Sequence, residues 1–236
     1  MEKKLIKYGN SEISYSVEFR NRKTLGITVT PEKAVQVAAP MNAAMADIEK
    51  KVTKRASWIL KQLRFMDRLG YEPQPLLGIS GETVYYLGRQ YRLKVNIGSK
   101  NVALKGKYLH VYVPDKTHLE IVRNAVLNWY RDHAKAKFNE RLLRVAHVLE
   151  AMEVTMGNLV VRKLENRWGS CTIKKNILLN TMLVQAPIDC IDYVIIHELC
   201  HLKEHNHGKA FYRLLNRHCP EWQRLVEKLG KYPYFH

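Results

Sequence analysis

The sequence predicts an α+β fold in two parts: a β-rich region with a long helix at residues 1–115, and a smaller core of helices and a short antiparallel sheet at residues 116–236. Two observations predict this division. In most of the first part apolar and polar residues alternate with period two, which is typical of half-buried strands. In the second part apolar residues recur every three or four positions, which is typical of helices that bury one face. Pro114 separates the two patterns.

Two strand-rich stretches enclose one long helix in the first part. This helix is predicted over residues 43–69, with Asn42 as its N-cap and Gly70 at its end, because Asn and Gly favour these positions. Antiparallel strands are predicted before and after it, with a turn at Gly88-Arg89 in the second set. The predicted strands cover residues 13–19, 25–29, 35–39, 84–87, 91–97, 102–104 and 109–113.

The second part should open with a long helix at Thr117, because Glu120 three residues later completes a capping box. This helix should continue to about residue 149. Two strands, a second helix and a final pair of helices follow it. The strands are predicted at residues 154–164 and 177–184, the second helix from Pro187 to about residues 205–206, and the final pair from Gly208 to Gly230 with a break at Cys219-Pro220.

Composition limits the class of protein and its partners. The chain has 236 residues, no apolar signal segment and no stretch long enough to span a membrane, and its four cysteines form no CxxC pair. These features predict a soluble cytoplasmic protein without a membrane partner. A formal net charge of +17 would attract nucleic acid to the basic surface, and one basic cluster extends from Arg89 to Lys107. The sequence indicates no oligomeric state.

The residues that indicate chemistry are His197-Glu198-Leu199-Cys200-His201, which have the H-E-x-x-H spacing. Residues four apart lie on one face of a helix, so His197 and His201 can bind one cation, and Glu198 can reach a water beside it. His207 lies within reach as a third ligand, which would leave one coordination position open, as in catalytic zinc sites. His205 and Glu204 are the alternatives for the third ligand.

Four further residues are candidates for contacts with a substrate or an oxyanion. The strand around Trp168 precedes the helix that carries the H-E-x-x-H motif, which we call the metal helix. We expect the backbone of this strand to pair with an extended peptide. Arg167, Tyr193 and Tyr212 could donate a hydrogen bond to an oxyanion. Packing of the core is the competing interpretation for all four residues. Cys171, as a thiolate, is a further candidate zinc ligand.

Three separated motifs resemble the YgjP-like zinc metallopeptidases, which are related to the SprT group. They are RWGSCT at 167–172, DYVIIHELCHL at 192–202 and NHGKAFY at 206–212. The resemblance extends to AAP at 38–40 and YYLGRQYRLKV at 85–95, and it departs at Tyr212, where the family often has Trp. It implies a β-rich N-terminal part before a small zincin-like core. It also implies one Zn²⁺ per chain held by His197, His201 and His207, with Glu198 as general base.

We therefore expect a zinc-dependent metallohydrolase. The favoured activity is hydrolysis of peptide bonds in polypeptide substrates, including nucleic-acid-associated proteins, with a zinc-activated water and Glu198 as base. Some proteins of the family carry a nucleotide pyrophosphatase assignment, so hydrolysis of nucleoside triphosphates such as UTP is an alternative. A third reading is a nucleic-acid-binding protein with a structural zinc, although a closed structural site would not need Glu198.

Overall fold

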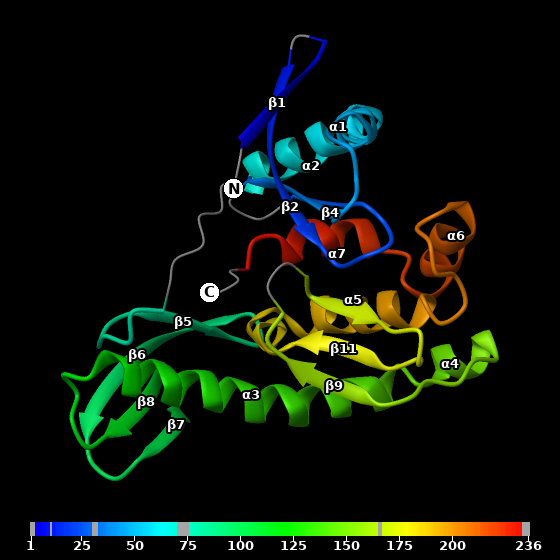
Figure 1. Cartoon of the computed structure of the whole chain (residues 1–236). Helices are drawn as coiled ribbons and strands as arrows, with labels where there is room; N and C mark the ends of the chain where they lie inside the picture. Colours follow the sequence, from blue (N-terminus) through cyan, green and yellow to red (C-terminus); the bar gives the residue numbers. More distant parts are fainter. Residues whose placement is uncertain (1–2, 10, 30–32, 70–75, 165–166, 233–236) are drawn as a thin grey trace. The chain divides into compact units, whose positions relative to one another are not determined.

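The computed structural model describes residues 3–9, 11–29, 33–69, 76–164 and 167–232, except for the side chains of residues 3 and 65–69. Within these ranges the chain forms two compact units, Met1–Pro73 and Gln74–His236 (Figure 1). The α+β class is confirmed, because both units combine sheets with helices. None of the described helices is both long enough and apolar enough to cross a membrane.

The N-terminal unit is a four-stranded sheet with two helices on one face. The strands are β1 (Lys3–Tyr8), β2 (Ser11–Arg20), β3 (Gly26–Val29) and β4 (Val35–Pro40), in the order β1-β2-β4-β3. Alternate residues of β2 and β4, such as Ile13 and Val37, are buried against Ile48 and Val52 of the first helix. The period-two pattern thus corresponds to one buried sheet face.

The long helix predicted at residues 43–69 is two helices, α1 (Met45–Lys54) and α2 (Ala56–Leu69), separated at Arg55. Its N-cap is Ala44 without a side-chain hydrogen bond, so the expected cap by Asn42 is wrong. The expected end at Gly70 lies outside the described residues. The strands are also not all antiparallel, since β2 and β4 are parallel neighbours.

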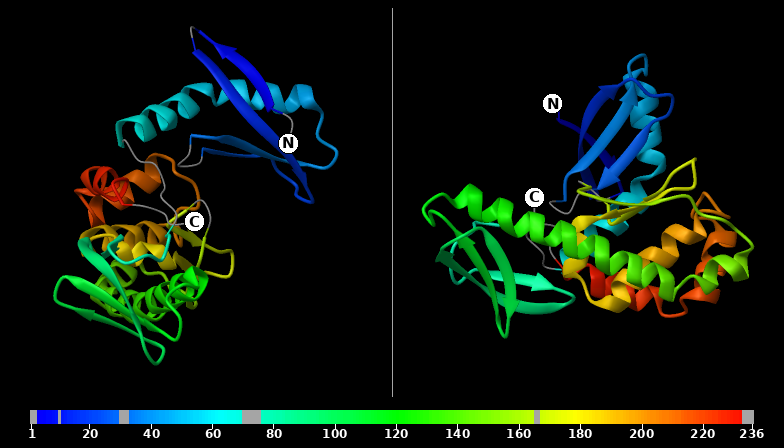
Figure 2. Two further views of the ribbon diagram at one scale, coloured as in Figure 1. Left: turned by 90° about the vertical axis from the view of Figure 1, so that its left-hand side faces the viewer. Right: turned by 90° about the horizontal axis from the view of Figure 1, so that it is seen from below.

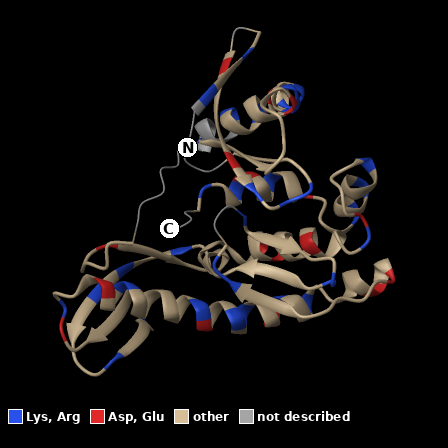
Figure 3. Cartoon of the chain, viewed as in Figure 1, with Lys and Arg blue, Asp and Glu red and all other residues tan. Residues whose placement is uncertain are grey.

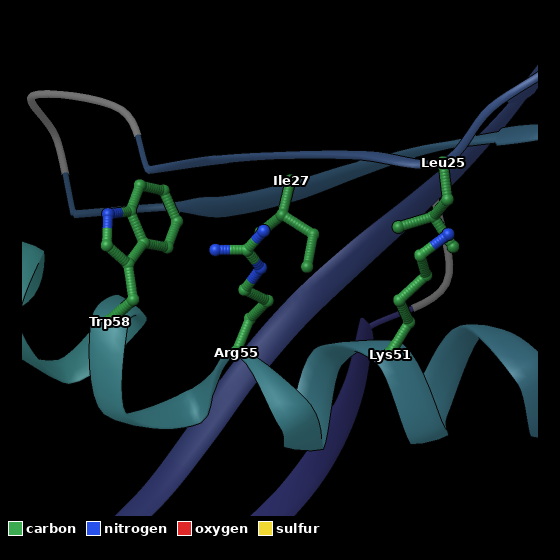
Figure 4. A pocket seen from close by; sticks show the side chains of 5 residues that line it. All are labelled: Leu25, Ile27, Lys51, Arg55 and Trp58. Atoms are coloured by element: carbon green, nitrogen blue, oxygen red, sulfur yellow. The ribbon is translucent and has the colours of Figure 1, made fainter. Parts of the chain in front are cut away.

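A small pocket lies in the N-terminal unit between its helices and the edge strand β3. Lys51, Arg55 and Trp58 project from the helical segment toward Leu25 and Ile27, and the side chain of Arg55 extends beside Ile27 (Figure 4). All five lining residues belong to this unit, whereas the H-E-x-x-H segment belongs to the other one. The pocket is therefore separate from the predicted metal site.

The C-terminal unit contains two sheets joined by helices. Its larger sheet has the order β5-β6-β8-β7, the same pattern as the N-terminal sheet, and its smaller sheet has the order β10-β11-β9. The strands are β5 (Thr83–Tyr86), β6 (Arg89–Ile97), β7 (Asn101–Lys105), β8 (Tyr108–Val113), β9 (Leu159–Arg162), β10 (Gly169–Cys171) and β11 (Ile177–Asn180). The helices are α3 (Leu119–Arg144), α4 (His147–Met152), the 3-10 helix η1 (Thr181–Gln185), α5 (Ile188–Cys200), α6 (Lys209–His218) and α7 (Trp222–Leu229).

Helix α3 connects the two sheets of this unit. It packs on β7 and β8 and also on η1, β9 and α5, and the right-hand view of Figure 2 shows it running along the unit. The buried Tyr130 hydroxyl donates a 2.6 Å hydrogen bond to the Tyr85 carbonyl of β5. One core therefore includes residues on both sides of Pro114. The compact units divide at Pro73, whereas the sequence placed the boundary at residue 115.

The turn between β5 and β6 also joins the larger sheet to the metal helix. The backbone N–H groups of Leu87 and Gly88 donate to the carbonyl groups of Val184 and Gln185, both at 2.9 Å. Gly88 has φ +81°, and a Cβ there would come within 2.7 Å of Pro187, the N-cap of α5. This close approach requires glycine at position 88.

Five local expectations for the C-terminal unit are wrong. The first long helix does not continue to residue 149, because α3 ends at Arg144 and a separate α4 follows. The smaller sheet is not wholly antiparallel, because β9 and β11 are parallel. The hydroxyl of Thr117 does not cap α3, because it donates instead to the carboxylate of Asp115 at 2.7 Å. The expected strand at 177–184 ends at Asn180 and continues as η1. The metal helix ends at Cys200, about five residues early, and His201 is its C-cap. The final helical pair, with its break near Cys219 and its C-cap at Gly230, is confirmed.

Helix α5 is buried on almost every side, so it is a core helix. Its sequence offers apolar residues on all faces, and the buried ones are Cys190, Ile191, Tyr193, Val194, Ile195, Ile196, Leu199 and Cys200. Asp192 connects α5 to α3 through hydrogen bonds. The guanidinium of Arg141 on α3 donates two hydrogen bonds to this carboxylate, at 2.8 and 2.6 Å. The two side chains are only 19% and 23% exposed.

We expect Asp192→Asn to destabilise the C-terminal unit by about 1–3 kcal/mol, because it removes the charge from a bidentate, half-buried pair. Thermal and urea unfolding would measure the change. The control is Asp132→Asn, which changes an exposed pair with Arg131 at 3.6 Å and should cost less than about 0.5 kcal/mol. If the two substitutions lowered the free energy of unfolding equally, the pair of Arg141 and Asp192 would not be a special stabilising contact of α5.

Candidate metal centre

Three histidine rings converge at the C-terminal end of α5. His197 lies in the last turn of the helix, His201 caps it, and His207 lies in the segment before α6. The Nε2 atom of His207 is 3.0 Å from Nε2 of His197 and 3.1 Å from Nε2 of His201. The early end of α5 makes this possible, because the chain turns after Cys200 and brings His207 back. Among the described residues these three form a group that could hold a metal ion.

The protonation of the rings suits metal binding. The Nδ1 atom of His201 lies 3.0 Å from the carbonyl oxygen of Glu204, which only accepts hydrogen bonds. Nδ1 therefore carries the proton, and the lone pair of Nε2 faces the other rings. Burial, together with the neighbouring His201 and His207, lowers the pKa of His197 to about 3. Burial also lowers the pKa values of His201 and His207. The rings are neutral at neutral pH, as ligands must be.

The separation of the nitrogens can be compared with that in a zinc site. Zinc–nitrogen bonds of about 2.0–2.1 Å in tetrahedral geometry place two ligand nitrogens roughly 3.3 Å apart. The observed 3.0 and 3.1 Å are close to this value. Three neutral imidazoles whose Nε2 atoms lie this close together therefore fit a zinc ion, which in a catalytic site would take a water molecule as its fourth ligand.

Phe211 fixes the orientation of the three rings. It is fully buried, and its ring centroid lies 5.0, 4.5 and 4.6 Å from those of His197, His201 and His207. The interpretation of the sequence did not include Phe211. Its signal was the spacing, since it follows His207 by four residues at the start of α6.

The carboxylate of Glu198 lies on a different side of α5, against strand β10. Glu198 is 6% exposed. A Cβ on Gly169 would come within 2.7 Å of its Cγ and 2.8 Å of its Oε1. The backbone N–H of Cys171 donates a hydrogen bond to the carboxylate. Burial raises the pKa of Glu198 to about 8, although the charge of Arg167 and the Cys171 hydrogen bond act in the opposite direction.

Strand β10, which carries Gly169, is at the edge of its sheet. Alternate residues of this segment exchange backbone hydrogen bonds with the neighbouring β11 segment. The N–H of Asn180 donates to the carbonyl of Trp168 at 2.8 Å, and the N–H of Thr172 donates to the carbonyl of Asn176 at 3.0 Å. By this alternation the backbone groups of Gly169 and Cys171 point away from β11, to the side where Glu198 lies. The Glu198 carboxylate therefore lies beside the outer edge of β10, the edge that does not pair with β11.

Asn180, a residue that sequence reasoning assigned no role, holds the segment before β10. Its fully buried amide donates to the carbonyl groups of Leu164 and Arg167, at 2.8 and 3.0 Å, and its oxygen accepts from the backbone N–H of Met182. A buried side chain with these bonds fixes two segments at once. It places Arg167 at the entrance to β10.

The four other candidates lie around this centre in different ways. The exposed Arg167 acts on Glu198 through its charge, and the half-buried Trp168 packs on the core. Tyr193 is buried with its ring 5.8 Å from that of His197. Tyr212 is exposed, with its ring 6.2 Å from that of His207 and stacked on Trp222.

The alternative ligands lie outside the cluster of three rings. His205 is exposed in the segment after α5, and Glu204 contributes its backbone carbonyl to His201. Burial and the charge of Glu198 raise the pKa of Cys171, so this residue is a thiol at neutral pH. His133 on α3 stacks on Trp129 with ring centroids 4.0 Å apart and is a packed histidine of the core.

Three convergent imidazoles, with a buried carboxylate next to the first of them, define the class of metal-dependent hydrolases. The chain matches the family model described as YgjP-like, metallopeptidase domain, over residues 23–232, and it belongs to this family. The resemblance seen in the sequence is thereby confirmed. This family implies a metal-dependent hydrolase with a metal ion, typically zinc.

Two individual proteins are similar to parts of the chain. The UTP pyrophosphatase of Escherichia coli (strain K12) is 37% identical over 57 residues, which are 24% of this chain and 34% of that protein. The match spans about a third of the length of this curated relative. The solved structure of the metallopeptidase zymogen of Methanocaldococcus jannaschii jannalysin is 25% identical, with 41% of this chain and 96% of that chain covered and a TM-score of 0.30.

We expect His207→Ala to lose zinc and His205→Ala to keep it. Metal analysis of the purified variants would measure about one zinc per chain in the wild type and in His205→Ala. At free zinc 100 times the Kd, binding should stabilise these two proteins by about 2.7 kcal/mol, which raises the Tm by roughly 5–10 °C. The reverse result, zinc lost only in His205→Ala, would make His205 the third ligand.

We expect Gly169→Ala to keep its zinc and to lose at least about tenfold in turnover. The added methyl group would displace the Glu198 carboxylate, which lies within 3.0 Å of that position, and misplaced catalytic groups act poorly. Gly98→Ala is the control, because its nearest Cβ neighbour would be at an ordinary 3.4 Å. Equal turnover of the two variants would show that the contact of Glu198 with β10 has no catalytic consequence.

Proposed function

We propose that this protein is a zinc-dependent peptidase in which His197, His201 and His207 hold the metal and Glu198 is the general base. The observation that carries the proposal is the convergence of three Nε2 atoms, with separations of 3.0 and 3.1 Å, on the helix that also holds the buried Glu198. The family assignment supports a polypeptide substrate. The charge of +17 favours proteins associated with nucleic acid.

Each part of the centre has a chemical task in this proposal. A zinc ion at this site would lower the pKa of a water molecule and polarise a carbonyl group. Glu198 accepts a proton from the attacking water at its carboxylate and returns it to the leaving amine nitrogen. Its burial suits this task, because a carboxylate with a raised pKa exchanges protons near neutral pH. The neutral histidines and Phe211 hold the ligand geometry fixed.

Strand β10 supplies a place for the substrate. The outward N–H and carbonyl of Gly169 and the outward carbonyl of Cys171 can pair with an extended peptide, which would add a strand at the sheet edge. The N–H of Cys171 donates to Glu198. A peptide in that position passes beside Glu198, because the same strand contacts the carboxylate. Binding through the backbone needs no particular substrate side chain, so we infer broad sequence tolerance next to the cleaved bond.

Hydrolysis of nucleoside triphosphates is the second candidate activity, and the similarity to a UTP pyrophosphatase favours it. The exposed Arg167 beside the centre could contact a phosphate. The donor set favours the peptidase, because Mg²⁺, the common partner of nucleotide phosphates, prefers oxygen ligands and not imidazoles.

One paired assay separates these functions. Wild type and Glu198→Gln would be incubated with casein, with a protein bound to DNA, and with UTP. We expect the wild type to cleave casein or the DNA-bound protein. Glu198→Gln should keep about one zinc per chain and lose roughly 10²–10⁴ in turnover, the usual contribution of a general base. Glu227→Gln, which removes the same charge from the exposed surface of α7, should act like the wild type.

Other outcomes exclude parts of the proposal. Full turnover by Glu198→Gln would exclude this residue as the base. Hydrolysis of UTP alone would replace the peptidase by a pyrophosphatase. If the protein bound zinc but turned over none of the three substrates, the remaining interpretation would be a nucleic-acid-binding protein with a structural zinc.

A further inference from the structure

The larger sheet of the C-terminal unit carries a row of aromatic rings among basic side chains. Strand β8 packs Leu109, Val111 and Val113 into the core with helix α3. Side chains alternate along a strand, so the residues between them point to the other face. We call this set the aromatic–basic face, and it consists of Tyr108, His110 and Tyr112 on β8, Arg92 and Lys94 on β6, and Lys105 on β7.

The register places cations on both sides of the rings. Arg92 on β6 and Lys105 on β7 are both the partners of Tyr108, and Lys94 is the partner of His110. Tyr108 is 46% exposed, and the three basic side chains are exposed as well. The Nζ atom of Lys94 lies 5.7 Å from the centre of the Tyr108 ring, and Arg92 is held by a 2.8 Å hydrogen bond to the Gly81 carbonyl.

The rings contact one another along β8, with the planes of Tyr108 and His110 inclined at 66° and those of His110 and Tyr112 nearly parallel. Tyr108 is exposed, and His110 and Tyr112 are half-buried. The centroids of Tyr108 and His110 are 6.0 Å apart, and those of His110 and Tyr112 are 6.2 Å apart with an angle of only 15° between their planes. These contacts run along one strand in the middle of the sheet. The rings are therefore supported by the backbone and do not depend on a loop for their position.

The charge of this region is of one sign. Residues 84–113 include six Lys or Arg residues and no Asp or Glu. Strands β6 and β7 carry blue in Figure 3, and none of β6, β7 and β8 carries red. Arg92 and Lys94 on β6 and Lys105 on β7 carry like charges on one face, with β8 between the two strands. Their repulsion reduces the stability of the sheet. A polyanion on the face would relieve the repulsion. The peptidase mechanism uses none of these residues.

We propose that the aromatic–basic face binds single-stranded nucleic acid, with bases stacked on Tyr108, His110 and Tyr112 and phosphates contacted by Arg92, Lys94 and Lys105. Flat rings can stack only on bases that are not already paired, so a duplex meets only the charges. An acidic peptide would use the charges and leave the rings without partners. Stacking accepts every base, so binding is tolerant of sequence. DNA and RNA single strands share this chemistry.

Fluorescence anisotropy with the full-length protein tests the proposal. The probes are labelled 20-residue oligo-dT and oligo-rU, and a duplex of the same length is the competitor. We expect at least one single strand to bind more tightly than the duplex. The logarithm of affinity should fall with the logarithm of salt concentration with a slope of about −2, because three cations contact phosphates and each contributes roughly 0.7.

Variants assign the binding to the face. Tyr108→Ala should weaken binding about 5- to 100-fold, and Tyr108→Phe, which keeps the ring, should restore most of it. Tyr8→Ala is the matched control, because Tyr8 is a strand residue of similar exposure, 43%, in the other unit. Lys94→Ala should reduce the salt slope by about 0.7, whereas Lys135→Ala, which removes an exposed charge of α3, should leave it unchanged.

The results that overturn the proposal are equally defined. They are tighter binding of the duplex than of both single strands, binding of neither strand at physiological salt, or equal losses for Tyr108→Ala and Tyr8→Ala. Casein cleavage by Tyr108→Ala should equal that of the wild type, since the face lies outside the metal centre. Far-ultraviolet circular dichroism of each variant verifies the fold, and the Lys94 variant tests the same face without removing a ring.

Discussion

The contact between Glu198 and strand β10 is the constraint on which the candidate active centre depends. A carboxylate that is 6% exposed is costly to bury unless hydrogen bonds and charge compensate for the lost water. The N–H of Cys171 and the charge of Arg167 provide part of this compensation, although burial still raises the pKa of Glu198 to about 8, and Gly169 provides the space. Since Glu198 is on the metal helix, the edge strand has a fixed position relative to the histidines. One buried side chain thereby aligns the proposed ligand site with the proposed peptide-binding edge.

Helix α3 gives this alignment its support. Its buried residues pack on the larger sheet at one end and on η1, β9 and α5 further along. Tyr130 binds β5 and Arg141 binds α5, so polar bonds fix the helix at both places in the core. The early end of α5 at Cys200 follows from the cap at His201. If the helix continued to residues 205–206, His207 could not return to the other two rings.

Periodicity in the sequence predicted most of the elements, because one buried face imposes a period of two on strands and of 3.6 on helices. The H-E-x-x-H spacing predicted which residues meet, because His197 and His201 are neighbours along one helix. Contacts between distant residues left no such signal. Nothing near Gly169 in the sequence indicates that Glu198 lies over it, and nothing at Thr117 indicates that Asp115 takes its hydroxyl. The boundary was placed after Pro114 because strands gave way to a helix there, although α3 packs back on those strands.

The aromatic–basic face and the metal centre have different physical origins, although both belong to the C-terminal unit. The residues of the metal centre are compensated where they lie: the carboxylate has its N–H donor, and the rings have Phe211. The residues of the face are compensated only in part. Lys94 lies over the Tyr108 ring and Arg92 donates to a backbone carbonyl, but the like charges on one face still repel. Stability alone therefore does not explain Tyr108 beside Arg92 and Lys105, whereas a stacked polyanion does. If such a strand also carries protein, its binding would raise the local concentration of polypeptide at β10. Backbone pairing at β10 does not depend on the side chains of the substrate, so it cannot distinguish one polypeptide from another. The basic charge would then select the substrates.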